Sequence, residues 1–266
     1  MIRTSFHSGA LSVNMRGLIT SFGAFHLLLY ICSGNARKVP ENADSPVFSF
    51  LEMNGKTSES VMLTDTTGSH SISVVGVVPS CTLRFLAVGG GGKGTCGGGG
   101  SGYVQYQSVQ VSSGTEISAE VGNFGEPSTV VINGKSTVAN QGQDHQSWEG
   151  GNGYSGGGDG SAGNNIYEGG TDGGDGGGSH GGSGTGEDIT AYDLSSWKLT
   201  PGAGGVGYGS CNCGCSGGGG GVMVDGSGPS AIDEKGQGYG GGGSGSNTGN
   251  NEYGLQGIIL LEITSG

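Results

Sequence analysis

Two glycine-rich stretches constrain this chain more than any other feature of its sequence. They span Gly150–Gly186 and Gly217–Gly243, and the whole chain holds 65 Gly in 266 residues, several-fold above average usage. Glycine loses more backbone freedom on folding than any other residue and buries no side chain. Such stretches are therefore flexible linkers unless their backbone N–H and C=O groups find partners.

The ordered alternative to a linker is polyglycine II, an extended left-handed helix of about three residues per turn without internal hydrogen bonds. Its N–H and C=O groups point outward, so neighbouring helices bond one another directly. Their axes come close enough only where no Cβ intervenes. The sequence thus leaves two interpretations, a flexible linker or a packed bundle of polyglycine helices, and the flanking segments discriminate between them.

Short runs of alternating apolar residues predict β-strands on both sides of the glycine stretches, and no segment shows a helical period. Asn133-Gly134 is typical of a type I′ hairpin turn, and Ser112-Ser113-Gly114 predicts a turn whose return strand is Thr115–Val121. The predicted strands are Val47–Leu51, Ser60–Leu63, Ser71–Val78, Cys81–Val88, Tyr103–Val111, Thr115–Val121, Ser128–Ile132, Lys135–Ala139 and Gly257–Ile263.

The order of these segments favours one all-β domain over two domains joined by a linker. The closing strand Gly257–Ile263 is too short to fold alone, so we expect it beside an early strand such as Cys81–Val88. The β scaffold then comprises about 47–140 and 255–264, and the glycine-rich insertions comprise about 89–102, 150–186 and 202–250. Insertions whose ends are pinned on a scaffold lose less entropy on ordering.

The first residues predict a secretory signal peptide. The apolar run Leu18–Cys32 follows Arg16 and precedes small residues that end at Ala36, which is the order of a cleaved signal sequence. An uncleaved anchor helix is the alternative, but the run is shorter than the ~20 residues of a spanning helix. We therefore expect a signal peptide over 1–36, with Met15 as a second candidate start. The mature domain 37–266 would be secreted, with no membrane span after cleavage.

The net charge limits the classes of partner that the chain can bind, and the cysteine content bears on its disulfide bonds. The formal net charge is −12, which argues against nucleic acid and anionic membranes and is compatible with Ca²⁺, mineral or basic partners. Disulfide bonds are expected in an oxidising compartment, and their odd number of candidates implies one free or intermolecular thiol. A site for a thiophilic metal is the alternative for Cys211, Cys213 and Cys215. The candidates are Cys81, Cys96, Cys211, Cys213 and Cys215.

The strands that enter and leave the glycine-rich stretches resemble a known family. Leu83–Gly92, Gly217–Val224, Gly236–Gly243 and the exit strand Gly257–Glu262 are similar to the glycine-rich ectodomain of anaplastic lymphoma kinase and leukocyte tyrosine kinase. The resemblance covers roughly Val47 to Thr264. It implies a jelly-roll-like β-sandwich with an inserted polyglycine II bundle, in a region that binds protein ligands in those receptors. No kinase sequence accompanies it, so signalling activity does not carry over.

Few residues suggest chemistry. Asp172 and Asp175 are three residues apart, so a polyglycine II helix would place both on one edge, where carboxylates could hold Ca²⁺. Solubilising charge is the alternative for both, and solvated surface positions are expected for His70, His145 and His180, with a metal pair of His145 and His180 as the alternative. Gly-Gly-Ser179-His180-Gly fits the nucleophile-elbow pattern but lacks its strand–helix context.

These observations predict a non-enzymatic, secreted protein without an assigned cofactor apart from the Ca²⁺ candidates. The function expected is structural or adhesive, in an extracellular or mineralised matrix, with an extracellular protein or matrix component as partner. The alternative is a soluble receptor-like module that binds a specific protein ligand.

Overall fold

The computed structural model describes residues 37–38, 48–52, 58–75, 81–160, 166–171, 173–206, 215–229, 235–245 and 253–265. All of them belong to one compact unit, Asn35–Gly266. The predicted signal peptide, 1–36, lies outside the described residues. Within the described ranges, no helix has the length and apolar character needed to cross a membrane.

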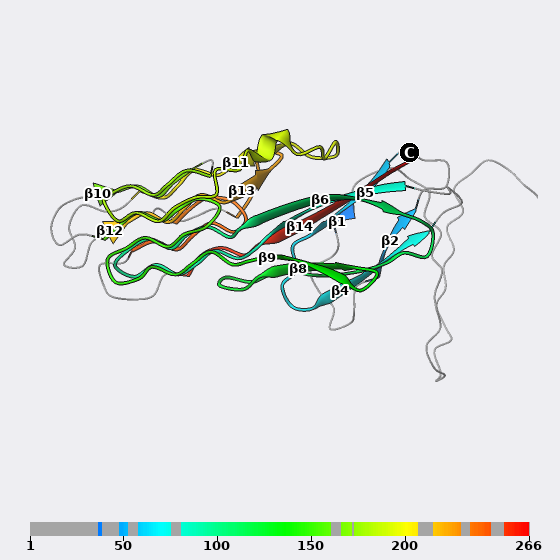
Figure 1. Cartoon of the computed structure of the whole chain (residues 1–266), viewed down its shortest axis with the longest axis horizontal. Coiled ribbons are helices and arrows are strands. Elements are labelled where there is room, and N and C mark those ends of the chain that lie inside the picture. The colour runs from blue at the N-terminus through cyan, green and yellow to red at the C-terminus, as the bar shows by residue number, and fades with distance from the viewer. Residues whose placement is uncertain are drawn as a thin grey trace, which may run out of the picture. The chain divides into compact units, whose positions relative to one another are not determined.

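The protein is all-β, as the sequence predicts, and most of its strands form two five-stranded sheets (Figure 1). The first sheet contains, in order, β1 (Arg37–Lys38), β3 (Ser58–Leu63), β14 (Ile258–Ser265), β5 (Cys81–Val88) and β6 (Val104–Val111). The second contains β2 (Phe48–Glu52), β4 (Ser69–Val75), β7 (Glu116–Glu120), β8 (Ser128–Ile132) and β9 (Lys135–Ala139). We call these sheets together the two-sheet region.

The closing strand lies inside the first sheet, which confirms its predicted pairing with Cys81–Val88. β14 is antiparallel to β5, with Ile258 opposite Val88, and antiparallel to β3 on its other side. The hairpin of β8 and β9 is confirmed as well. Asn133 and Gly134 join its strands with φ of 48° and 79°, the positive values that a type I′ turn requires.

The predicted hairpin of Tyr103–Val111 with Thr115–Val121 is wrong. β6 pairs with β5 in the first sheet, whereas β7 pairs with β4 and β8 in the second. The tight turn itself is present, since the Thr115 amide donates to the Ser112 carbonyl at 3.1 Å. The chain passes there from one sheet to the other, because the apolar faces of β6 and β7 both contribute to the core between the sheets.

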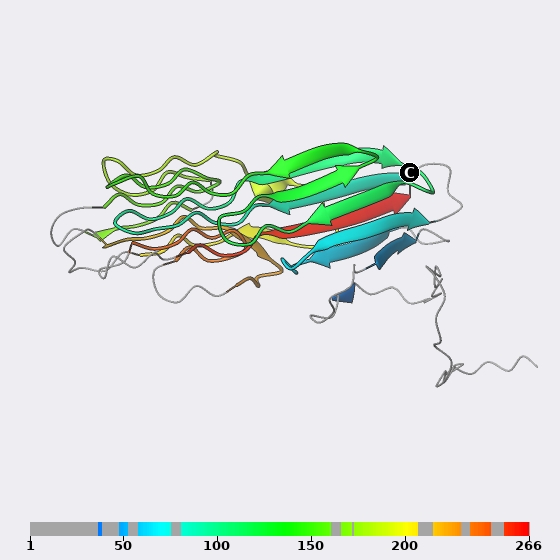
Figure 2. The same cartoon turned by 90° about the horizontal axis from the view of Figure 1, so that it is seen from below.

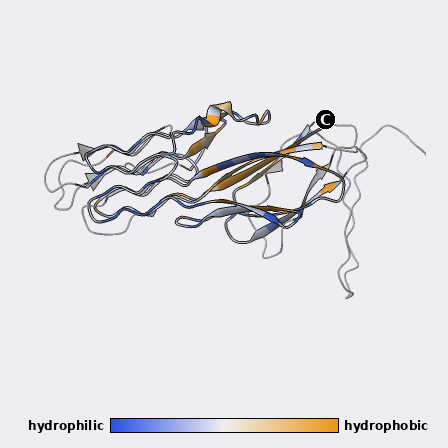
Figure 3. Cartoon of the chain, viewed as in Figure 1, coloured by the Kyte–Doolittle hydropathy of each residue, from blue (hydrophilic) through white to orange (hydrophobic). Residues whose placement is uncertain are grey.

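Two apolar cores flank the first sheet, and the apolar colours of Figure 3 gather on its strands. The core between the sheets includes Ile72, Leu83, Phe85, Val130 and Leu261. The second core covers the other face of the first sheet with residues of 189–199 and of the pair β11 (Leu199–Pro201) and β13 (Val222–Val224). The three-residue 3₁₀ helix η1 (Ile189–Ala191) begins this cover.

A buried carboxylate fastens the cover to the first sheet. Glu262 of β14 is fully buried, and its carboxylate accepts hydrogen bonds from the backbone N–H and the hydroxyl of both Ser195 and Ser196, at 2.6–3.0 Å. Beside it, Tyr106 stacks on Tyr192 with ring centroids 4.7 Å apart. Burial raises the pKa of the Tyr192 hydroxyl, and its hydrogen bond to Glu187 raises it further.

The glycine-rich segments run alongside one another beyond the ends of β5, β9 and β14 (Figure 2). We call them the glycine region. The stretch Gly97–Gly102 shares backbone hydrogen bonds of 2.8–3.0 Å with six other stretches. Those bonds join it to Gly92, Gln143, Gly151, Gly158, Gly219 and Gly243. A short parallel pair, β10 (Ile166–Tyr167) with β12 (Cys215–Ser216), belongs to the same region.

The segments of the glycine region lie too close together for side chains. A Cβ built on Gly98 would stand 2.0 Å from the carbonyl oxygen of Gly217, and one on Gly219 would stand 2.1 Å from that of Ser155. Real Cβ atoms essentially never approach an oxygen closer than about 3 Å. The backbone of one segment thus occupies the space that a side chain on the next would need.

Candidate functional site

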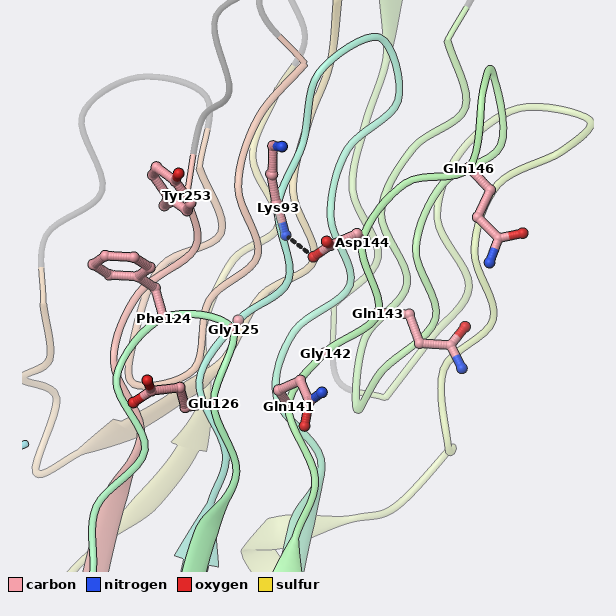
Figure 4. A pocket seen from close by; sticks show the side chains of 11 residues that line it. Lys93, Phe124, Gly125, Glu126, Gln141, Gly142, Gln143, Asp144, Gln146 and Tyr253 are labelled. Atoms are coloured by element: carbon pink, nitrogen blue, oxygen red, sulfur yellow. Dashed lines mark hydrogen bonds between the residues drawn. The ribbon is translucent and has the colours of Figure 1, made fainter.

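A pocket of about 600 Å³ opens where the glycine region meets the two-sheet region (Figure 4). Its size lies within the range of ligand sites, about 300–1,000 Å³. Residues from four separate parts of the chain line it: the stretch after β5, the loop between β7 and β8, the stretch that follows β9, and the stretch that leads into β14. Only the fold brings these parts together.

Two exposed aromatic rings form one wall of the pocket. Phe124 is 43% exposed and Tyr253 is 48% exposed. Their ring centroids are 4.6 Å apart and their planes are tilted by 41°. A single exposed apolar side chain is ordinary, whereas these two rings form a contiguous exposed aromatic pair at the edge of a pocket.

Gly91 holds both aromatic loops in place. The amide of Gly125, next to Phe124, donates to the Gly91 carbonyl at 2.9 Å, and the Gly91 amide donates at 2.9 Å to the carbonyl of Leu255, two residues after Tyr253. A Cβ on Gly91 would stand 2.0 Å from the Gly241 carbonyl oxygen. The aromatic wall therefore depends on the close backbone packing of the glycine region.

The opposite side of the pocket is polar and carries primary amides. Gln141, Gln143 and Gln146 extend from the stretch after β9, and Figure 4 shows Gln143 and Gln146 across from the two rings. The Gln143 side-chain oxygen accepts from the Asn152 amide at 3.0 Å. Within the described part of the chain, the side chains of Gln141 and Gln146 make no hydrogen bond and are exposed, so their donors and acceptors are unmatched.

The charged groups around the pocket are two carboxylates and one ammonium. They belong to Glu126, Asp144 and Lys93. One Asp144 oxygen accepts from the backbone N–H of Lys93 at 2.8 Å, which fixes the carboxylate at the pocket floor. The pocket as a whole is slightly acidic.

A second cluster surrounds the buried carboxylate of Asp159, which is 3% exposed. One of its oxygens accepts from the His180 backbone N–H at 2.9 Å and from the Ser179 hydroxyl at 3.4 Å. The His180 Nδ1 lies 3.1 Å from that hydroxyl and 3.9 Å from the same carboxylate oxygen. A catalytic relay needs the two imidazole nitrogens to serve the acid and the nucleophile separately. Here Nδ1 of His180 lies near both the Ser179 hydroxyl and the Asp159 carboxylate, so the cluster does not have the geometry of such a relay.

The described structure does not test the pair of Ca²⁺ candidates, because only one of the two is among the described residues. Asp172 lies outside the described residues, and Asp175 is exposed, with one carboxylate oxygen accepting from the Gly184 amide at 3.0 Å. Among the described residues, no group of three or more His, Cys, Asp or Glu side chains could hold a metal ion. A Ca²⁺ site at Asp172 and Asp175 stays a prediction.

The expectation of a solvated surface position is wrong for His70. This side chain is 2% exposed, because it lies on β4, and its Nε2 lies 3.1 Å from the Asp65 carbonyl oxygen. His180 is exposed, as expected, whereas His145 is half-buried. Each of the latter two has its own neighbours, the Lys93 carbonyl for His145 and Ser179 for His180, so the alternative of a metal pair gains no support.

The cysteines divide between the two regions. Cys81 is a free thiol, contrary to its selection as a disulfide candidate, because it faces the core between the sheets and is 2% exposed. Cys96, in the glycine region, is disulfide-bonded, and its carbonyl accepts from the hydroxyl of Ser216. Cys211 and Cys213 lie outside the described residues, as does the side chain of Cys215.

No pattern in the sequence predicted the aromatic residues of the pocket. Phe124 stands between Asn123 and Gly125, and Tyr253 stands before Gly254, so the only local signal was an aromatic residue among turn-forming neighbours. Compared with known proteins, the chain matches no family model and no curated protein.

Proposed function

We propose that this chain is a secreted, non-enzymatic structural or adhesive module of an extracellular matrix. In this proposal a jelly-roll-like β-sandwich carries a bundle of polyglycine II helices, and the bundle is a stiff support for binding loops. Four observations support it: the glycine-rich composition, the predicted signal peptide, the resemblance to glycine-rich ectodomains, and the arrangement of the glycine segments described above.

The observation that carries the proposal is the way in which the glycine segments contact one another. A polyglycine II helix directs its N–H and C=O groups outward on all sides, so an interior helix bonds with neighbours all around it. The stretch Gly97–Gly102, with its six bonded neighbours, has that pattern. The exclusion of Cβ atoms at Gly98 and Gly219 is the other requirement of such a bundle.

Stiffness is what this arrangement supplies to an adhesive protein. Binding loses affinity when loops must be ordered at the moment of contact, and preorganised loops avoid that loss. Here the two aromatic loops are bonded to one glycine of the bundle, Gly91. The backbone of the bundle thus supports a fixed contact surface for the two rings.

A soluble receptor-like module is the second candidate function. The exposed pair of Phe124 and Tyr253 favours it, because aromatic residues are enriched at the centres of protein–protein contacts. In that case the partner would be one specific extracellular protein.

Fractionation of cells that secrete the full chain tests the proposal. We expect the protein to begin near Arg37, to leave the cells, and to remain with the insoluble matrix until a denaturant releases it. Recovery from the medium in a stoichiometric complex with one protein would favour the receptor-like module. Retention inside the cells, or a secreted monomer without any partner, would contradict both candidates.

A further inference from the structure

We infer that the pocket between the aromatic pair and the glutamines binds a neutral oligosaccharide. The inference deepens the proposed adhesive function and rests on it, since it names the class of matrix component that the module holds. It is carried by four features of the pocket: its aromatic wall, its amide wall, its charge and its rigidity.

The division of the pocket into an aromatic wall and a polar wall matches the two sides of a sugar ring. A pyranose has an apolar face of C–H groups and a rim of hydroxyls. Phe124 and Tyr253 together offer an exposed aromatic surface on which such a face can stack. Aromatic rings bury large apolar areas at low cost in side-chain entropy, so this wall would supply most of the affinity.

The amide wall matches the hydroxyl rim. A hydroxyl both donates and accepts, and a primary amide offers both functions on one planar group. Gln141 and Gln146 have no side-chain hydrogen bond to another described residue, and Gln143 uses its oxygen alone. Their amide groups can therefore bond to adjacent hydroxyls without breaking a contact within the described chain.

The charges in the pocket select against acidic sugars and against proline-rich peptides. Glu126 and Asp144 outnumber Lys93, so a sulfate or a uronic acid would meet like charge. Proline-rich segments also dock in aromatic grooves, but prolines have no N–H to donate, and carboxylates only accept. Sugar hydroxyls can donate to both carboxylates.

The pocket floor is rigid before any ligand arrives. A Cβ on Gly142 would stand 2.0 Å from the Gly100 carbonyl oxygen, as one on Gly91 would from Gly241. The Gly142 amide donates to the Gly90 carbonyl, and the Gly90 amide donates to the backbone carbonyl of Glu126. Because the floor is bonded backbone to backbone, the ligand need not order it.

Titration calorimetry of the secreted full chain tests the inference. The probes are cellohexaose, chitohexaose and laminarihexaose, with a heparin hexasaccharide and a proline-rich peptide for comparison. We expect saturable binding of at least one neutral hexasaccharide, with little dependence on salt because no charge is paired. The variants Phe124→Ala and Tyr253→Ala should each weaken it by about tenfold or more.

Two further variants separate pocket effects from general ones. Trp148→Ala removes an aromatic side chain that is also 43% exposed but does not line the pocket, and its affinity should equal that of the unmodified chain. Gln141→Ala alters the exposed amide wall only and should weaken binding severalfold. A melting curve for each variant confirms that it is folded.

Three results would overturn the inference: no binding of any neutral probe, binding of heparin or the peptide alone, or an affinity indifferent to Phe124→Ala and Tyr253→Ala. If the protein still partitions into the insoluble matrix, the adhesive function stands and only the sugar assignment fails. If the protein binds a neutral sugar but stays in the medium and not with the insoluble matrix, the pocket assignment is correct and the proposed matrix role fails.

Discussion

Side chains stabilise the two-sheet region, whereas backbone hydrogen bonds stabilise the glycine region. Between the sheets, side chains such as Leu83, Phe85 and Leu261 fill the space and exclude water. In the glycine region, backbone N–H and C=O groups of separate segments bond directly, and a Cβ would collide with them. The two regions should therefore be sensitive to different substitutions, since the two-sheet region loses stability when atoms are removed and the glycine region loses it when atoms are added.

The largest effect is expected from truncation in the two-sheet region. Phe85 is fully buried, so Phe85→Ala leaves a cavity and should lower the free energy of unfolding by about 4 kcal/mol. The control is Phe124→Ala, where the ring is 43% exposed and the change should be within about 0.5 kcal/mol. Denaturant melts of both variants measure the difference, and equal losses would break the comparison.

A smaller loss of stability is expected from the opposite kind of substitution, the addition of one methyl group to the glycine region. Gly219→Ala would place a Cβ 2.1 Å from the Ser155 carbonyl oxygen and should cost about 2–3 kcal/mol, the range of overpacked cores. Gly68→Ala is the matched control, because no atom lies within 4 Å of its Cβ position; it should be neutral or slightly stabilising. Similar stability of the two variants would mean that the glycine segments are not packed as described.

The smallest of the three effects concerns the cover over the first sheet, which depends on a side chain bonded to backbone amides. Glu262→Ala removes the acceptor of Ser195 and Ser196 and should cost about 2 kcal/mol. Both serines are exposed, so water partly replaces the carboxylate. Glu120→Ala, on the exposed side of β7, should cost less than about 0.5 kcal/mol. An unchanged Glu262→Ala melt would show that the Glu262 carboxylate does not stabilise the cover.

Much of the two-sheet region could be predicted from sequence, because its signals are local. Alternation located Cys81–Val88, turn chemistry located the Asn133-Gly134 hairpin, and the apolar closing strand needed a partner. The pairing of the strands was harder to predict from the sequence. The turn after β6 has the residues of a hairpin, yet it leads into the other sheet, since local periodicity carries no information about the sheet that a strand joins.

The pocket could not be predicted, because its parts meet only through the glycine region. Phe124 and Tyr253 are far apart in the sequence, and Gly91 connects them through its amide and its carbonyl. Glycine carries no side chain from which a contact could be read. The burial of His70 was equally hidden, since its polar neighbours in the sequence suggested a surface position.

Amide hydrogen exchange of the purified full chain tests the central claim most directly, namely that backbone bonds order the glycine region. Amides at Gly98, Gly99 and Gly219 donate to other segments at 2.8–3.0 Å, so we predict protection comparable with that of β5 and β14 in the two-sheet region. The exposed turn residue Gly226 is the internal reference for fast exchange. Exchange of the three glycine amides at random-coil rates, while β5 and β14 remain protected, would contradict the account.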